Sequence, residues 1–128
     1  MNDLLLPVST TDHSAGAETA VITLVEYGDF ECPDCGNAYP IVKQWQQEFG
    51  SALRLIFRQM PLDQLYPIHP HATKAAQAAE AAARQGKFWE MHDALFEHQD
   101  QLEEPGILVH PLEQLHAAIA ADLHEGLQ

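Results

Sequence analysis

Two short apolar runs in the first half of the chain have the composition of β-strands. Val21-Ile22-Thr23-Leu24-Val25-Glu26-Tyr27 is rich in β-branched and aromatic residues and ends at Gly28-Asp29, which is typical of a buried strand. Leu53-Arg54-Leu55-Ile56-Phe57-Arg58 has the same character, with Pro61 soon after it. Residues 1–20 show no periodicity, so we expect a mostly extended lead-in without regular structure.

The segment between these two runs has helical periodicity. Its apolar positions are Tyr39, Val42, Trp45 and Phe49, and we expect them to face inward. Gly50 stands where a helix C-cap glycine belongs, and Pro33 suits the first turn, where its missing N–H costs nothing. Pro40 lies inside the same helix and should kink it. Strand, helix and strand over residues 21–60 predict a βαβ unit with parallel strands and a right-handed crossover.

The second half of the chain is predicted to be helical over about residues 71–125. An alanine-dominated stretch from His71 to Gln85 ends at Gly86. A second apolar face, which includes Phe88 and Met91, predicts a helix over about 87–99, and a last helix is expected from Pro111. With 128 residues, the chain is expected to form a single domain over residues 1–128.

Charge and composition narrow the classes of partner. The formal net charge is −13, with 19 acidic against 6 basic residues, which disfavours nucleic acid and an anionic membrane surface as partners. The start Met1-Asn2-Asp3 lacks the basic residues of a secretory signal, and no apolar stretch approaches the ~18 residues of a spanning helix. We therefore expect a cytoplasmic location. Two cysteines three positions apart indicate redox chemistry or a metal rather than a disulfide scaffold.

The two cysteines lie where the predicted helix begins. The free N–H groups and the dipole of a helix N-terminus favour a thiolate at Cys32, which can then attack a disulfide. One turn later, Cys35 can resolve the mixed disulfide, while Pro33 restricts the backbone between the two sulfurs. We expect Cys32 to be exposed and Cys35 to be more buried. The predicted catalytic residues are therefore Cys32 and Cys35.

The segment Val25-Glu26-Tyr27-Gly28-Asp29-Phe30-Glu31-Cys32-Pro33-Asp34-Cys35 resembles the active-site segment of DsbA-like thiol–disulfide oxidoreductases of the thioredoxin superfamily. Phe57-Arg58, Ile68-His69-Pro70-His71-Ala72 and Gly86-Lys87-Phe88-Trp89-Glu90-Met91-His92 continue the resemblance. The resemblance implies an α/β fold in which an α-helical insertion follows the thioredoxin-like βαβ half. It also implies an oxidoreductase or isomerase without a bound organic cofactor. Its partners would be a disulfide-containing protein or a small thiol substrate, and an external thiol reductant or oxidant.

The chain departs from this family after about residue 103. Family members continue to a Thr-Pro or Val-Pro loop with a cis-proline, then two strands and a helix, whereas no such dipeptide follows Pro111 here. We therefore expect the C-terminal ββα half to be absent or incomplete. Because a two-stranded sheet is marginal alone, a partner or a second copy could complete the sheet.

Acidic residues around the motif are expected to tune its redox potential. Asp34 lies between the cysteines and Glu31 just before them. Negative charge near Cys32 opposes thiolate formation and partly cancels the helix dipole. Together with Asp29, these acidic residues predict a weaker oxidant, closer to a reductase or an isomerase.

Three alternative readings of the motif stay open. The chain could be a non-catalytic thioredoxin-like binding module that only forms mixed disulfides. A structural zinc site would need two more ligands, for which His69 with His71, or His92 with His98, are the candidates, although these histidines are more simply explained by capping and packing. A glutathione-dependent transferase or isomerase usually replaces the second cysteine, so Cys35 argues against that branch.

Overall fold

The computed structural model describes residues 4–66 and 69–102. Its sheet has three strands, β1 (His13–Ala15), β2 (Ile22–Gly28) and β3 (Leu53–Gln59), in the order β1-β3-β2. The sheet is mixed, because β2 is parallel to β3 whereas β1 is antiparallel to it.

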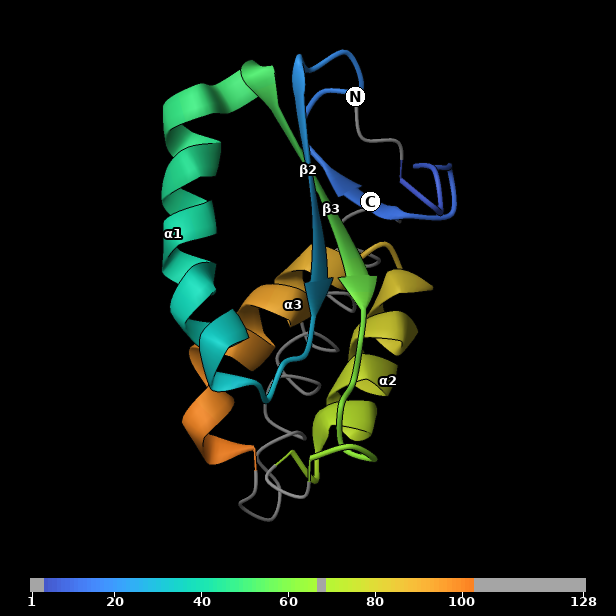
Figure 1. The fold of residues 1–128 in the computed structure, drawn as a ribbon, viewed down its shortest axis with the longest axis vertical. Helices are drawn as coiled ribbons and strands as arrows, with labels where there is room; N and C mark the ends of the chain where they lie inside the picture. Colours follow the sequence, from blue (N-terminus) through green and yellow to red (C-terminus); the bar gives the residue numbers. More distant parts are fainter. Residues whose placement is uncertain (1–3, 67–68, 103–128) are drawn as a thin grey trace, which may run out of the picture.

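The parallel pair confirms the two strands predicted from the apolar runs. Ile22 lies opposite Leu53, and the register continues to Gly28 opposite Gln59. Both strands therefore end at the same edge of the sheet, as the arrowheads in Figure 1 show. The segments that leave these two ends are the ones that build the candidate site.

The strand β1 was not predicted. Three residues are too few to show a period, so this strand depends on contacts far away in the sequence. The ring of His13 stacks on Phe88 with centroids 3.7 Å apart, and the indole Nε1 of Trp89 donates to the carbonyl oxygen of Ser14 at 3.1 Å. These contacts hold the N-terminal segment against the helical half of the molecule.

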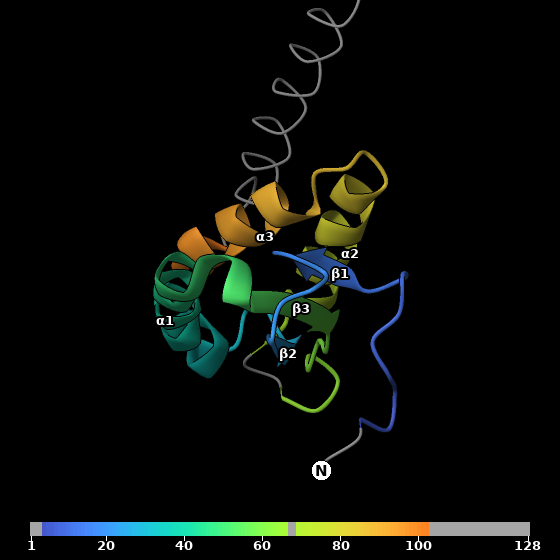
Figure 2. The ribbon, with the colours of Figure 1, turned by 90° about the horizontal axis from the view of Figure 1, so that it is seen from above.

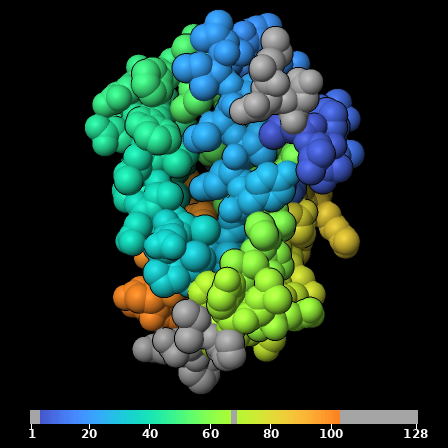
Figure 3. All heavy atoms as spheres, in the orientation of Figure 1, coloured from blue at the N-terminus to red at the C-terminus, as the bar shows by residue number. Residues whose placement is uncertain are grey.

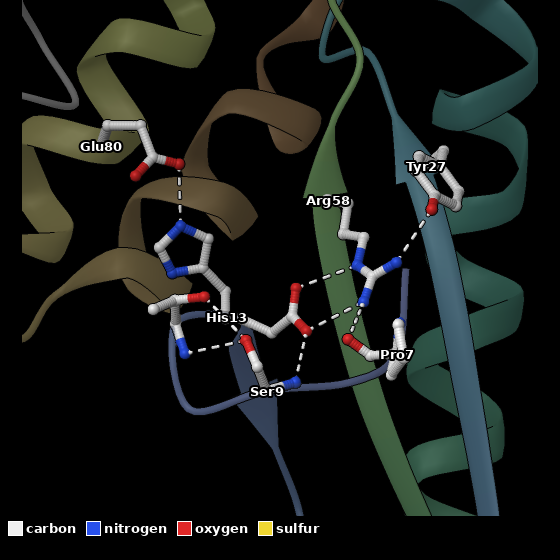
Figure 4. A network of polar contacts seen from close by, with 8 residues as sticks. Pro7, Ser9, His13, Tyr27, Arg58 and Glu80 are labelled. Carbon is white, nitrogen blue, oxygen red and sulfur yellow. Dashed lines mark hydrogen bonds and ion pairs between the residues drawn. The ribbon is translucent and has the colours of Figure 1, made fainter. Parts of the chain in front are cut away.

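Arg58 at the end of β3 anchors the segment before β1 (Figure 4). Its guanidinium donates to both carboxylate oxygens of Asp12, at 2.9 and 3.0 Å, to the Tyr27 hydroxyl and to the Pro7 carbonyl. The Asp12 carboxylate also accepts from the backbone N–H of Ser9 at 3.0 Å. The bond from Arg58 is the largest of the effects that lower the pKa of Asp12.

The helices occur where the periodicity predicted them. They are α1 (Pro33–Phe49), α2 (Ala72–Ala83) and α3 (Phe88–Glu97), with 3₁₀ turns η1 (Gly50–Ala52) and η2 (Gln99–Gln101). The α1 helix continues through Pro40 and ends at Gly50, whose φ of 50° favours glycine. The helix expected from Pro111 lies outside the described residues. In the part that the structure describes, no helix is both long and apolar enough to cross a membrane.

The core lies between β3, α2 and α3. Figure 2 shows α1 on one flank of the sheet, with α2 and α3 together next to β1. Phe57 of β3 is fully buried, and its ring contacts the aromatic rings of Phe30 and Phe88. The small alanines of α2 allow this helix to approach α3 closely, with Ala75 and Ala79 fully buried. Phe88 and Met91 are buried, as predicted.

The outer part of α1 corrects one expectation. Trp45 and Phe49 were expected to face inward, but they are 41% and 46% exposed. They line an apolar groove of about 340 Å³ with Ile22, Leu24 and Leu53. This groove lies beside β2, the edge strand of the sheet, and Figure 3 shows the residues of β2 running down the middle of this face. The predicted helix is confirmed, but among the described residues no element covers the part of its apolar face that contains Trp45 and Phe49.

Candidate redox site

The two parallel strands bring the candidate site together at their carboxyl ends. Residues 29–35 follow β2 and lead into α1, while residues 60–71 follow β3 and lead into α2. In open α/β sheets, ligands bind outside the carboxyl ends of the strands. The cysteine motif therefore lies at the edge of the sheet where a substrate is expected.

Cys32 occupies the N-cap of α1, and Cys35 lies in its first turn. Cys32 has extended backbone angles, φ −71° and ψ 125°, and its carbonyl accepts the N–H of Gly36 at 3.0 Å. The Cys32 side chain makes no capping hydrogen bond, so the N-terminal N–H groups of a 17-residue helix remain available to a negative charge there. Pro33 occupies the first helical position, as predicted.

Both thiols are free and partly exposed, so the expected contrast between an exposed Cys32 and a buried Cys35 is not seen in their exposure. The two nevertheless differ in their surroundings, because Cys35 packs against the hydrophobic core. Burial is the largest of the effects that raise the pKa of Cys35 to about 11; a side-chain hydrogen bond with Cys32 and the charge of Glu26 add to it. Cys35 is therefore a thiol at neutral pH, which suits a resolving cysteine better than an attacking one.

Glu26 is a functional candidate to which the sequence alone assigns no separate role. It lies on β2, and burial raises the pKa of its carboxyl. Its charge in turn raises the pKa of Cys35. A half-buried carboxylate that interacts with a buried thiol can accept the proton of that thiol.

Asp29 and His69 form a buried carboxylate–imidazole pair beside the motif. Their side chains are 1% and 5% exposed, and His69 Nδ1 lies 3.1 Å from Asp29 Oδ2. Asp29 also accepts the backbone N–H of Glu31 at 2.8 Å and that of Leu62 at 3.0 Å. One carboxylate thus ties the end of β2 to the connection between β3 and α2.

A second carboxylate–histidine pair lies next to the first. Glu31 Oε1 accepts the backbone N–H of His71 at 2.8 Å, and Glu31 Oε2 lies 3.1 Å from His71 Nδ1. Glu31 was predicted to tune the motif through its charge, but its carboxylate is taken up by His71 at the start of α2. Glu31 therefore also has a structural role, because it links the active-site segment to α2.

A hollow of about 380 Å³ opens beside Cys32. Its lining consists of Cys32, Pro33, Asp34, Leu62, Tyr66 and His69. It lies between the start of α1 and the segment that follows β3. A disulfide that reaches this hollow meets Cys32, whereas Cys35 is not part of the lining.

Gln99, from η2, fixes the backbone of the motif from the helical half of the molecule. Its side-chain amide donates to the carbonyl oxygens of Phe30 at 2.9 Å and Cys32 at 2.7 Å. A Cβ added at Gly36 would collide with this amide, so the first turn of α1 and Gln99 fit closely. No local signal could have identified Gln99, since 67 residues separate it from Cys32.

The histidines considered as zinc ligands have other partners. His69 and His71 pair with Asp29 and Glu31, and His98 Nδ1 lies 2.8 Å from the carbonyl of Ala94. His92 is buried among aromatic rings. Within residues 4–66 and 69–102, no group of three or more metal-ligating side chains could hold a metal ion.

The structure thus combines a βαβ unit, two cysteines at the start of its helix and a helical region that follows. The sequence pattern of the thioredoxin family matches residues 8–127 of the chain. The chain belongs to the thioredoxin family. The fold class predicted from the sequence is thereby confirmed, with a partial thioredoxin-like α/β domain that contains a mixed three-stranded sheet.

Several solved structures are similar to the chain in fold. ScsC from Proteus mirabilis matches with a TM-score of 0.67 and 16% identity, over 84% of this chain and 47% of that chain. BdbD from Bacillus subtilis matches with a TM-score of 0.63 and 25% identity, over 88% and 68%. DsbA2 from Pseudomonas aeruginosa matches with a TM-score of 0.59 and 21% identity, over 93% and 76%. These neighbours include DsbA-like thiol–disulfide oxidoreductases, so the predicted resemblance is confirmed.

The curated relatives of this thioredoxin-like chain carry a different name. It is 49% identical over 107 residues to Na(+)/H(+) antiporter NhaA 3 of Salinispora tropica, and 50% identical over 101 residues to Na(+)/H(+) antiporter NhaA 1 of Mycolicibacterium vanbaalenii. These matches cover 83% and 78% of this chain. The chain spans 16% of the length of each of these relatives.

Proposed function

We propose that the chain is a thiol–disulfide oxidoreductase that acts through the Cys32-Pro33-Asp34-Cys35 motif on protein or small-molecule disulfides. The observation that carries the proposal is the unequal pair of thiols at the start of α1. Cys32 lines an open hollow at the helix N-terminus, whereas Cys35 packs against the core and has a raised pKa. This asymmetry separates an attacking cysteine from a resolving one.

The reaction follows from these positions. The Cys32 thiolate attacks one sulfur of a substrate disulfide, forms a mixed disulfide and expels the other sulfur as a thiolate. Cys35 then transfers its proton to Glu26, and its thiolate attacks the Cys32 sulfur and expels the second substrate thiolate. The substrate is reduced by two electrons, and Cys32 and Cys35 are oxidised to a disulfide. An external thiol reductant restores the pair, and an external oxidant drives the reaction in the opposite direction.

The shape and charge of the hollow support the type of substrate. Leu62, Tyr66 and Pro33 offer apolar surface to a peptide or a small disulfide, while Asp34 adds negative charge beside the attacking sulfur. We propose that this charge makes the couple a weak oxidant, closer to a reductase or an isomerase. Replacing Asp34 with His should make the couple more oxidising, as measured by equilibration with glutathione redox buffers. An unchanged or more reducing couple would contradict the electrostatic explanation.

The function is tested by turnover with dithiothreitol as reductant. The unaltered chain should reduce insulin and form an intramolecular disulfide, whereas Cys32→Ser should do neither. Cys35→Ser should accumulate a mixed disulfide without turnover, because it can attack but not resolve. Capture of partners by the unaltered chain without any turnover would favour the non-catalytic binding module instead.

The antiporter relatives support a second candidate function. We propose that the chain acts as a redox domain on thiols of a sodium/proton antiporter, because about half of its positions match a segment of proteins with that name. Sodium/proton exchange in membrane vesicles should then change when the oxidised chain replaces the reduced chain. The Cys32→Ser variant should remove this difference.

We also propose that the chain works in the cytoplasm. In intact cells, a thiol reagent that does not cross the membrane should leave Cys32 unmodified, whereas a permeant reagent of the same chemistry should modify it. Modification by both reagents would place the motif on the other side of the membrane.

A further inference from the structure

His69 and Asp29 have a geometry that fixes the hydrogen of the imidazole. Asp29 accepts two backbone N–H groups, from Glu31 and Leu62, and its Oδ2 also lies 3.1 Å from His69 Nδ1. The oxygens of a carboxylate accept hydrogen bonds. His69 Nδ1 must therefore be the donor, which leaves Nε2 as the nitrogen that gains or loses a proton.

The imidazole with this fixed tautomer forms part of the wall of the hollow that contains Cys32. His69 is 4% exposed, so packing restricts the orientation of its ring. The connection that carries it begins at the end of β3, and Asp29 belongs to the segment that follows β2. The parallel pairing of these strands therefore brings an oriented imidazole to the hollow that Cys32 lines, from a position 37 residues further along the chain.

From this arrangement, we infer that His69 is the acid–base residue of the first exchange step, with Asp29 as its positioning residue. This inference rests on the proposed oxidoreductase function. Neutral His69 takes the proton of the Cys32 thiol at Nε2, and the Cys32 thiolate attacks the substrate disulfide. One substrate sulfur leaves as a thiolate and takes the proton back from His69 Nε2–H. The products are a mixed disulfide on Cys32, one free thiol and neutral His69, so protons and electrons balance.

The groups that face His69 come from three segments. Asp29 lies just after β2, Cys32 and Asp34 come from the start of α1, and Tyr66 belongs to the same connection, with its ring centroid 5.7 Å from that of His69. Once His69 has taken the Cys32 proton, its Nε2–H supplies the donor that a strongly basic leaving thiolate needs.

His71 provides a matched control. It pairs with Glu31 through the same nitrogen and at the same 3.1 Å as His69 with Asp29, but it does not belong to the lining of the hollow. Replacing either histidine with Asn keeps a side-chain N–H close to the position of Nδ1, so the bond to the carboxylate can persist while the proton-transferring Nε2 is removed.

The experiment compares two disulfides in the Cys35→Ser background, where the reaction stops at the mixed disulfide. Oxidised glutathione expels a basic alkyl thiolate, which benefits from a proton donor, whereas 5,5′-dithiobis(2-nitrobenzoate) expels a weakly basic aromatic thiolate, which does not. The measured quantity is the second-order rate constant for oxidised glutathione divided by that for 5,5′-dithiobis(2-nitrobenzoate). The fraction of Cys32 present as thiolate cancels in this ratio.

General acid–base catalysis contributes a rate factor of ~10²–10⁴. His69→Asn should therefore lower the ratio at least about tenfold. His71→Asn should leave the ratio unchanged. With the histidine at position 69 intact, the ratio should also fall as the pH rises through the titration of an imidazole. This last measurement needs no altered His69, so it tests the inference even if His69→Asn does not fold.

Equal slowing of both reactions by His69→Asn, or a ratio that does not depend on pH with His69 intact, would overturn the inference and leave the oxidoreductase function standing. Failure of Cys32 to react with either disulfide, with His69 in place, would instead overturn the function itself and the inference with it.

Discussion

At the scale of single residues, the site depends on polar groups with little access to water. Burial raises the pKa values of Glu26 and Cys35, and the carboxylate raises that of the thiol further. Because both groups become negatively charged when they lose a proton, the pair favours a state in which one of them keeps its proton. The partly buried carboxyl of Glu26 destabilises the fold at neutral pH but gives the resolving thiol an acceptor for its proton.

Replacing Glu26 with Gln should separate these two effects. Because the pKa of this carboxyl is higher in the folded chain, its ionisation lowers the free energy of unfolding as the pH rises above about 4.3, the pKa in the unfolded chain. The variant with the neutral amide should therefore be more stable than the wild type at pH 7. The same change should slow release of the mixed disulfide by Cys35 at least about tenfold. Urea unfolding and the lifetime of the mixed disulfide measure the two effects. Glu18→Gln, at an exposed position, is the control and should change neither.

His92 is the second residue whose titration matters for stability. Burial is the main cause that lowers its pKa, and its buried Nε2 has no hydrogen-bond partner. The unfolded chain binds the proton at about pH 6.5, but the folded chain binds it only at lower pH. The contribution of His92 to stability is therefore full above about pH 7 and is lost as the pH falls below 6.5.

His92→Phe should remove this acid-sensitive contribution. The difference in Tm between wild type and variant should be constant above about pH 7 and should shift in favour of the variant as the pH decreases. Thermal unfolding of both proteins from pH 5 to 8 measures this difference in Tm. A difference that does not change over this range would show that the buried imidazole does not govern acid stability.

At the scale of elements, the helical half holds the active-site segment in place. Gln99 of the 3₁₀ turn η2 donates to the carbonyl oxygens of Phe30 and Cys32, and the Glu31 carboxylate accepts the backbone N–H of His71 at the start of α2. The motif thus has two attachments to elements that follow it in sequence, besides its covalent connection to β2 and α1. The helical region therefore positions the motif as well as covering the core.

Gln99→Ala should cost about 1–3 kcal/mol in the free energy of unfolding, because it removes two hydrogen bonds of roughly 0.5–1.5 kcal/mol each. It should also speed amide hydrogen exchange in the first turn of α1. Gln101→Ala, in the same turn but exposed, should change neither quantity. A double mutant with Gly36→Ala should be less destabilised than the sum of the two single changes, because the added methyl group then has room.

At the scale of the whole molecule, the two neighbours of the central strand β3 differ. Strand β1 covers the outer side of β3, whereas β2 is an edge strand with the apolar groove beside it. The core on the side of α2 and α3 is closed around Phe57. Stability should therefore depend on position in a way that the apolar pattern of the sequence alone does not predict.

Phe57→Ala should cost about 3–5 kcal/mol, as expected for a fully buried aromatic ring. Phe49→Ala, which removes the same number of atoms from a ring that is 46% exposed, should cost less than about 1 kcal/mol. Denaturant unfolding of both variants gives the comparison. Similar costs would mean that the groove is covered in solution.

The sequence was sufficient for features that depend on local pattern. It located β2, β3, α1, α2 and α3, because apolar period, Pro33 and the glycines at 50 and 86 act within one element. It also located Cys32 and Cys35, because their spacing and their position before a helix can be read directly from the chain. These predictions needed no knowledge of which elements are neighbours.

Only the tertiary structure decided which distant side chains meet. The buried pair of Asp29 with His69, the bonds of Gln99 and the strand β1 all join residues about 40 or more positions apart. The pair of Asp29 with His69 forms because the parallel pairing of β2 and β3 brings the segments after these two strands to one edge of the sheet. Local pattern specifies each element, but the surroundings that set the chemistry of the Cys32 sulfur come from packing between elements.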